Sequence, residues 1–144
     1  MPDGQLCLYH AIGLPNALWT DTTKAFAEKY VAKTGRARPE SYAMEAYDSL
    51  KLMAQAINEA GTDDADAVIA ALENISYDGA LGRIYFDYGT KNPVPDGVPA
   101  SAWHQFPDPA VTMVQFQQEG ESAADLTVVY PEKFKTGEML FPGE

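Results

Sequence analysis

The sequence predicts an α/β fold, and three observations carry this prediction. A nearly continuous apolar run at residues 5–12 is typical of a strand that is covered on both faces. Two long segments follow, at residues 16–34 and 39–60, in which apolar residues recur at the helical period. Near the end of the chain, apolar and polar residues alternate at 111–117, which predicts a further strand. The length of 144 residues suits one domain or part of a larger one.

The first element is the strand at residues 5–12, which Gly13 and Pro15 end. Because this strand is apolar on both faces, we expect it at the centre of a sheet. No obvious parallel neighbour for it is found along the chain. The sheet is therefore expected to need strands from elsewhere.

Two long helices come next. Asn16 or Thr20 can cap the first, and Gly35 ends it. The second follows Pro39 and ends at Gly61. We expect the apolar positions of each to face the core, namely Trp19, Phe26 and Tyr30 in the first and Ala43, Ala46, Tyr47, Leu50, Met53, Ala54 and Ile57 in the second.

A third, shorter helix begins at Thr62 or Asp63 with an acidic first turn, which suits the helix dipole. Its apolar positions are Val68, Ile69, Leu72 and Ile75. The acids Asp63, Asp64 and Asp66 also resemble the opening of a calcium loop, but Asn74 or Ile75 stands where an EF-hand needs glutamate. Helix capping is the better interpretation.

The remaining strands are short. Gly79 and Gly82 bracket a turn that leads into a strand at residues 84–86. Five prolines between residues 91 and 109 then predict a long surface loop. A hairpin closes the chain, with a turn around Gly120 and strands at residues 111–117 and 126–130.

Composition excludes several classes of function. Ten Lys and Arg against 21 Asp and Glu give a formal charge of −11, so nucleic acid is a poor partner. The single Cys7 excludes an intrachain disulfide framework and a multi-thiolate zinc site. His10 and His104 are too far apart in sequence to form a local metal site. We therefore expect no metal and no cofactor.

No catalytic constellation is found in the sequence. The nucleophile-elbow, dinucleotide-binding and P-loop motifs are all absent. Cys7 and His10 lie three positions apart on the predicted strand, so their side chains point to opposite faces. Because no nucleophile, base and orienting group can be named together, we predict that the protein is not an enzyme.

One local feature points to ligand binding, at the start of the second helix. Tyr42 and Glu45 lie together there, off the predicted core-facing side and close to a helix N-terminus. A tyrosine and a carboxylate can hold an aromatic or amine-bearing small molecule. The alternative is that Tyr42 covers the helix start and Glu45 is solvated.

A set of short motifs, in order and spacing, resembles a known family. The motifs are Phe26-x-x-x-Tyr30, Gly35, Pro39, Tyr42, Ala46-Tyr47-Asp48, Ala56-Ile57, Ala60-Gly61, Val68, Ala71-Leu72, Gly79-x-x-Gly82-x-Ile84-x-Phe86-Asp87, Gln115-Phe116, Gly120 and Val128-Val129-Tyr130-Pro131. This set resembles the C-terminal part of the solute-binding proteins of ABC importers, in the branched-chain amino acid and amide group with the type I periplasmic binding fold.

The resemblance implies a receptor in which two lobes close over an amino acid, amide or aromatic acid and deliver it to a membrane permease. The full-length parent would be periplasmic, whereas no signal peptide is seen in this chain. The whole chain, residues 1–144, would be one truncated unit. By the resemblance, residues 1–13 would be the last strand of the second lobe with the hinge, and residues 14–90 the C-terminal part of the first lobe. Residues 91–110 would be a hinge loop, and residues 111–144 the closing hairpin and tail of the second lobe.

The resemblance also implies ligand contacts. The residue at the position of Tyr42 is an aromatic that lines the cleft in similar proteins, and Glu45 lies one turn further along the helix. Tyr9 and His10 fall where the chain would cross the hinge. The candidate ligand-binding residues are thus Tyr42, Glu45, Tyr9 and His10.

By this resemblance we expect the chain to lack most of the sheet of the first lobe and the loops that hold a ligand carboxylate. Uncovered apolar faces of such a fragment favour association. We therefore expect a homodimer or a swapped oligomer, in which the strand at residues 5–12 pairs with its copy. The alternative function is that of a truncated, self-associating fragment that binds no solute tightly.

Overall fold

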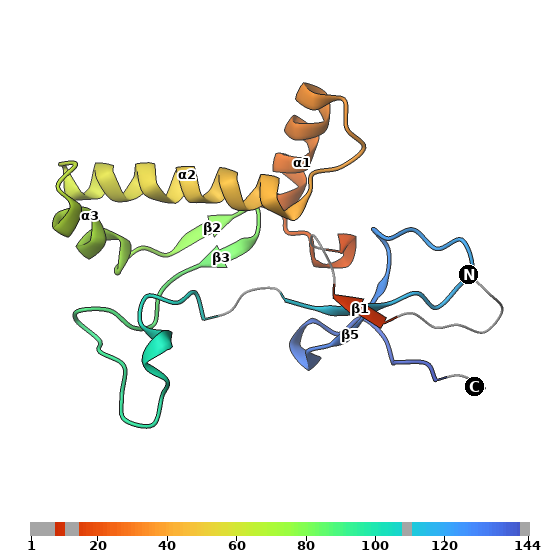
Figure 1. Cartoon of the computed structure of the whole chain (residues 1–144). Helices are drawn as coiled ribbons and strands as arrows, with labels where there is room; N and C mark the ends of the chain where they lie inside the picture. The colour runs from red at the N-terminus through yellow and green to blue at the C-terminus, as the bar shows by residue number, and fades with distance from the viewer. Residues whose placement is uncertain (1–7, 11–14, 108–110, 142–144) are drawn as a thin grey trace.

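The structure, a computed structural model, describes residues 8–10, 15–107 and 111–141. The described elements fall into two groups (Figure 1). One group contains the helices α1 (Asp21–Thr34), α2 (Ser41–Ala60) and α3 (Ala65–Leu72) with the strands β2 (Tyr77–Gly79) and β3 (Gly82–Ile84). The other contains the strands β1 (Leu8–His10), β4 (Met113–Gln115) and β5 (Thr127–Tyr130). The predicted α/β class is confirmed.

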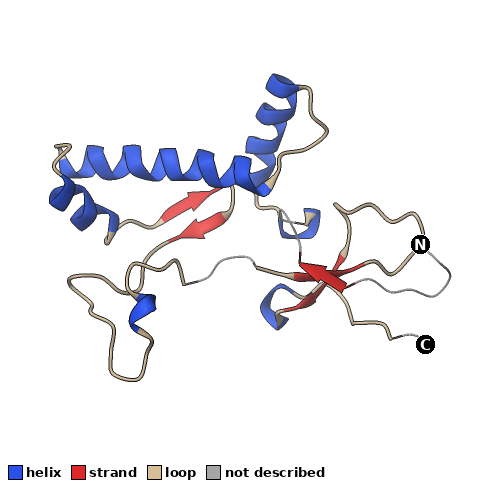
Figure 2. Cartoon of the chain, in the orientation of Figure 1, coloured by secondary structure: helices blue, strands red, loops and turns tan. Residues whose placement is uncertain are grey.

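Local capping fixes the helix ends close to their predicted positions (Figure 2). At the start of α1, Thr20 and Thr23 cap each other's backbone N–H groups. Gly35 and Gly61 end α1 and α2 with φ of +71° and +66°, a conformation that favours glycine. The α3 helix starts later than predicted, because the Asp64 carboxylate is the group that accepts from the Ala67 N–H.

The side of α2 that faces the core differs from the prediction. Met44, Asp48 and Ala56, at successive spacings of four and eight positions, are fully buried against the β2–β3 hairpin and α3. The apolar set predicted to be buried is largely exposed, with Leu50 at 75% and Met53 at 46%. The prediction for this helix face is therefore wrong for the described chain, because the hairpin and α3 cover the neighbouring face.

The three-stranded sheet has the order β1-β4-β5 with antiparallel pairing throughout. Strand β1 pairs only with β4 among the described residues, so it lies at the edge of this sheet and not at its centre as predicted. An apolar run in the sequence does not distinguish an edge strand from a central strand. Residues 5–7 and 11–12 of the predicted strand, including Cys7, lie outside the described residues.

Both predicted turns are present. The β4–β5 hairpin is confirmed, with Gly120 at φ +76° in its connection. In the other hairpin, β3 begins directly at Gly82, whose φ is +104°, and not at residue 84 as predicted. Its partner β2 was not predicted, because Asp78 and Gly79 are poor strand formers.

The predicted proline-rich loop is confirmed for residues 91–107, with one short 3-10 helix, η2 (Ala100–Ala102). Two more 3-10 helices are η1 (Asn16–Leu18) and η3 (Glu132–Phe134). Leu18 in η1 packs against the buried cluster around Met44 and also against the cluster of Val114, Leu126 and Val128 in the sheet. This residue therefore joins the two groups of elements.

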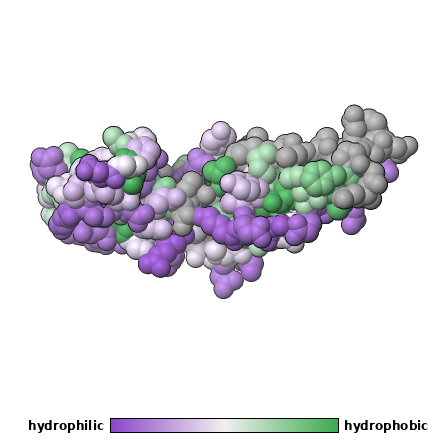
Figure 3. Space-filling view, turned by 90° about the horizontal axis from the view of Figure 1, so that it is seen from below, coloured by the Kyte–Doolittle hydropathy of each residue, from purple (hydrophilic) through white to green (hydrophobic). Residues whose placement is uncertain are grey.

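Seen from below, the molecule is elongated, with hydrophobic residues scattered among hydrophilic ones (Figure 3). None of the described helices has the length and hydropathy of a membrane span.

Candidate ligand-binding site

The turn of the β2–β3 hairpin is fixed by side chains from two helices. The Asp48 carboxylate on α2 accepts hydrogen bonds from the N–H groups of Ala80 at 2.9 Å and Leu81 at 2.8 Å. On the other side, the Thr23 hydroxyl of α1 donates to the Ala80 carbonyl at 2.7 Å. Both side chains are buried. These hydrogen bonds therefore hold the turn of the hairpin in place against α1 and α2.

The hairpin packs closely against α2. A Cβ atom at Gly79 would lie 2.5 Å from an Asp48 carboxylate oxygen, so the approach requires glycine. Beside this contact, burial raises the pKa of the Tyr77 phenol, and the negative charge of Asp48 raises it further. The phenol is thus kept neutral next to the buried carboxylate.

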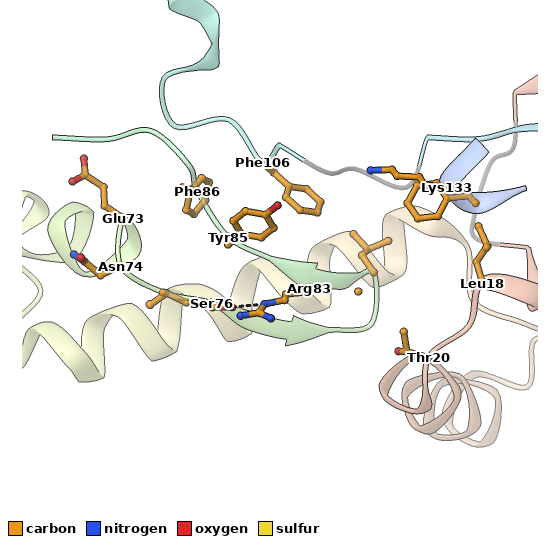
Figure 4. Close-up of a pocket in the computed structure, with 14 residues that line it drawn as sticks. Leu18, Thr20, Glu73, Asn74, Ser76, Arg83, Tyr85, Phe86, Phe106 and Lys133 are labelled. Atoms are coloured by element: carbon orange, nitrogen blue, oxygen red, sulfur yellow. Dashed lines mark hydrogen bonds between the residues drawn. The ribbon is translucent and has the colours of Figure 1, made fainter. Parts of the chain in front are cut away.

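A cavity of about 850 Å³ lies along this hairpin, and residues of both groups of elements line it (Figure 4). Three charged residues are Glu73, Arg83 and Lys133, and aromatic rings form much of the wall. The other lining residues are Leu18, Thr20, Asn74, Ile75, Ser76, Leu81, Gly82, Tyr85, Phe86, Phe106 and Phe134. A mainly apolar wall with a few polar groups is typical of small-molecule sites.

Both aromatic and cationic side chains line this cavity. The rings of Tyr85 and Phe106 meet edge to face at a centroid distance of 6.4 Å. Arg83 donates from Nε to the Ser76 hydroxyl at 2.7 Å, and the Lys133 ammonium lies 4.7 Å from the centroid of the Phe134 ring. These groups can hold an aromatic body and an anionic group of a ligand.

Glu73, just after α3, is the centre of a hydrogen-bonded cluster with Thr90 and His104. Its Oε1 accepts from the Thr90 N–H at 2.8 Å, the Thr90 hydroxyl at 2.9 Å and His104 Nε2 at 2.7 Å. The hydrogen bond from His104, followed by that from the Thr90 N–H, holds the pKa of this carboxyl below its ordinary value. The cluster attaches the proline-rich loop to the end of α3.

Glu73 also borders a second, smaller cavity of about 150 Å³. Its other lining residues are Ile69, Leu72, Phe86 and His104. The backbone at Gly89 approaches Glu73 so closely that a Cβ would lie 2.6 Å from its Cδ. The Glu73 side chain is consequently only 7% exposed.

Two of the residues predicted to bind ligand, Tyr42 and Glu45, lie outside these cavities. Tyr42 is 73% exposed in the first turn of α2, and Glu45 is exposed one turn later. The structure describes Tyr9 and His10 by their backbone in β1, opposite Val114 and Met113. Neither Tyr42 nor Glu45 lines either cavity described above.

Sequence reasoning missed the cavity residues. Arg83, Tyr85 and Phe86 were recognised only as parts of a turn and strand, and Glu73 was not singled out. A signal was available in the aromatic pair Tyr85-Phe86, which follows Arg83 after one intervening residue, but its partners Phe106 and Lys133 are distant in sequence. Within the part of the chain that the structure describes, no three His, Cys, Asp or Glu residues gather as metal ligands do.

A comparison with protein families identifies the chain. The family described as "Periplasmic binding protein" matches residues 9–102, which is 94 of the 144 residues. The chain belongs to this family. It is a type I periplasmic binding protein family that includes the binding proteins of branched-chain amino acid ABC transporters. No curated protein matches the chain.

Membership of the periplasmic binding protein family gives the general function. Proteins of the family bind small-molecule solutes, and the family is non-enzymatic. The family also indicates a periplasmic location. The matched region runs from the second residue of β1 to the end of η2 and includes Glu73, Arg83 and Tyr42, whereas the β4–β5 hairpin lies beyond it.

Proposed function

We propose that the chain is the C-terminal portion of the solute-binding receptor of an ABC importer, with an amino acid, an amide or an aromatic acid as the solute. In this proposal the full-length receptor works in the periplasm and passes the solute to a membrane permease. The observation that carries it is the cavity of about 850 Å³ between two groups of elements in a chain of this family.

The proposed division of the chain follows the two groups of elements. Residues 14–90 form the C-terminal part of the first lobe, and residues 91–110 form the hinge loop. Residues 1–13 and 111–144 belong to the second lobe, which agrees with the pairing of β1 with β4. Leu18 packs on both groups, as a residue near a hinge would.

We also retain the proposed contacts at Tyr42, Glu45, Tyr9 and His10. The exposure of Tyr42 supports its availability to a solute, and the helix N-terminus beside it favours an anionic group. Closure of the lobes in the full receptor would then bring these residues to the solute.

Thermal unfolding across a panel of amino acids, amides and aromatic carboxylates tests the proposal. A solute at about 100 times its dissociation constant should raise the free energy of unfolding by about 2.7 kcal/mol. If the solute contacts Tyr42, the shift should disappear in Tyr42→Ala and persist in Tyr130→Ala, which removes another exposed tyrosine. A shift that persists in both variants would place the solute in the cavity alone, which Tyr42 does not line. If no compound shifts the transition, solute binding by this chain is wrong.

A second candidate is a fragment that self-associates and binds no solute tightly. It is favoured by the exposed side of α2, where Tyr47, Leu50, Met53 and Ile57 are each more than a third exposed. The unpaired edge of β1 among the described strands adds a place for a second copy to pair. In this alternative the copy covers the apolar side that the described chain leaves open.

A further inference from the structure

Glu73 uses its two carboxylate oxygens unequally. All three hydrogen bonds from Thr90 and His104 end on Oε1. Among the described residues, no donor is within hydrogen-bonding distance of Oε2. The side chain as a whole is only 7% exposed, but Oε2 is not among the buried polar atoms that lack a partner, so this oxygen stays accessible to a ligand.

The space around Glu73 suits a positive group. Glu73 and Phe86 both line the large cavity and the small one, so a carboxylate and an aromatic ring border the same openings. Figure 4 shows Phe86, Tyr85 and Phe106 following Glu73 along the cavity, with Lys133 toward the opposite end. An ammonium ion is attracted both by a carboxylate and by an aromatic face.

The carboxylate is also ionised and held in place. The hydrogen bonds from His104 and Thr90 lower its pKa, so it stays negative at neutral and mildly acidic pH. Three hydrogen bonds to one oxygen fix the orientation of the other before any ligand arrives. Such preorganisation lowers the entropic cost of binding.

We propose that Glu73 binds the ammonium group of the solute through Oε2, while the rings of Tyr85, Phe86 and Phe106 hold an apolar or aromatic body. The ligand class is a primary arylalkylammonium compound, including an amino acid with an aromatic side chain. The inference rests on the proposed solute-binding function and adds a site that the sequence did not indicate.

Isothermal titration of the full chain with three probes tests this site. Phenethylammonium carries the positive group, 2-phenylethanol is its neutral counterpart, and 3-phenylpropionate carries a negative group instead. We expect the ammonium to bind at least tenfold more tightly than the other two. Glu73→Gln should remove this preference, whereas Glu119→Gln, a change at an exposed loop carboxylate, should leave it intact.

A second variant separates charge recognition from attachment of the loop. His104→Gln weakens the cluster but leaves the Glu73 charge, so the ammonium should bind within about threefold of its original affinity. If Glu73→Gln does not fold, the unaltered chain provides the test. It should bind the ammonium more tightly than the alcohol, and this preference should become smaller as the salt concentration rises.

Equal binding of the ammonium and the alcohol, or an unchanged affinity in folded Glu73→Gln, would overturn the inference. If another solute binds without dependence on Glu73, the inference fails and the proposed function stands. If no probe and no compound of the solute panel binds, both fail.

Discussion

Asp48 gives a physical reason for the spacing of two motifs that lie far apart in the sequence. Ala46-Tyr47-Asp48 on α2 and Gly79-x-x-Gly82 in the hairpin meet because the carboxylate accepts from the backbone of the turn. Gly79 leaves the room that this contact needs. The resemblance detected in the sequence therefore reflects a buried hydrogen-bonded contact and not only helix periodicity.

Replacing Asp48 should destabilise the fold strongly. Asp48→Ala leaves one buried and one partly buried N–H group without partners, and we expect the free energy of unfolding to fall by about 3 kcal/mol. Asp63→Ala, at an exposed aspartate, should change it by less than about 0.5 kcal/mol. Urea unfolding followed by circular dichroism measures both, and equal midpoints for the two variants would contradict the role of Asp48.

Glu73 should make the attachment of the proline-rich loop depend on pH. Its pKa is lowered in the folded chain, so its contribution to stability is complete above the ordinary glutamate pKa of about 4.3 and is lost as the pH falls through the folded value. Thermal unfolding between pH 6 and about pH 3 should show this loss. The fall should be smaller in Glu73→Gln, and identical profiles would rule out this linkage.

At the scale of elements, α2 has one buried face and one exposed face. One face packs on the hairpin and α3 through Met44, Asp48 and Ala56, while the other exposes Leu50 and Met53. A helix with an apolar side open to water is a candidate interface. Self-association through this side can be tested by a single polar substitution.

Leu50→Gln should shift the chain toward monomer if α2 forms the contact between copies. Leu50 is 75% exposed, so the change should affect the stability of the monomer by less than about 0.5 kcal/mol. Lys51→Gln, on the next residue and outside the apolar set, is the matched control. Light scattering during size-exclusion chromatography gives the molar mass, and a monomer in the unaltered chain at all concentrations would exclude the self-associating alternative.

The helices were predictable because their ends are set by local chemistry. Thr20, Gly35 and Gly61 act through hydrogen bonds and backbone conformations within a few residues of each helix end. The buried side of α2 was not predictable in the same way. Apolar spacing shows which side favours burial, but Asp48 and the hairpin, 32 residues away, decide which side is covered in this chain.

Only the candidate residues at the start of one helix could be grouped from the sequence. Tyr42 and Glu45 are neighbours on one helix, so their proximity follows from the sequence. The cavity joins residues from Leu18 to Phe134, and no local spacing brings these together. The pairing of Glu73 with His104 likewise depends on the path of a proline-rich loop that has no period.

For the whole molecule, Leu18 connects the two groups of elements. Its side chain packs on both buried clusters, and near it the Asn16 amide nitrogen donates to the Asp125 carboxylate at 2.8 Å. The two groups therefore share part of their stability. Movement of one group against the other has to repack this residue.

Leu18→Ala should uncouple the two groups. We expect the free energy of unfolding to fall by about 2 kcal/mol and a single calorimetric transition to broaden or split. Leu50→Ala removes the same atoms from an exposed position and should keep the original transition. An unchanged sharp transition in Leu18→Ala would show that the two groups are coupled elsewhere.

The two tryptophans are separate fluorescent reporters for the connection at Leu18 and for the proline-rich loop. Trp19 packs beside Met44 and Ala80 next to Leu18, with the Arg38 guanidinium 5.2 Å from its ring centroid. The Trp103 ring centroid lies 5.0 Å from that of His104, in the loop attached by Glu73. Emission from Trp103→Phe therefore follows the connection between the two groups, and emission from Trp19→Phe follows the loop, without any added label.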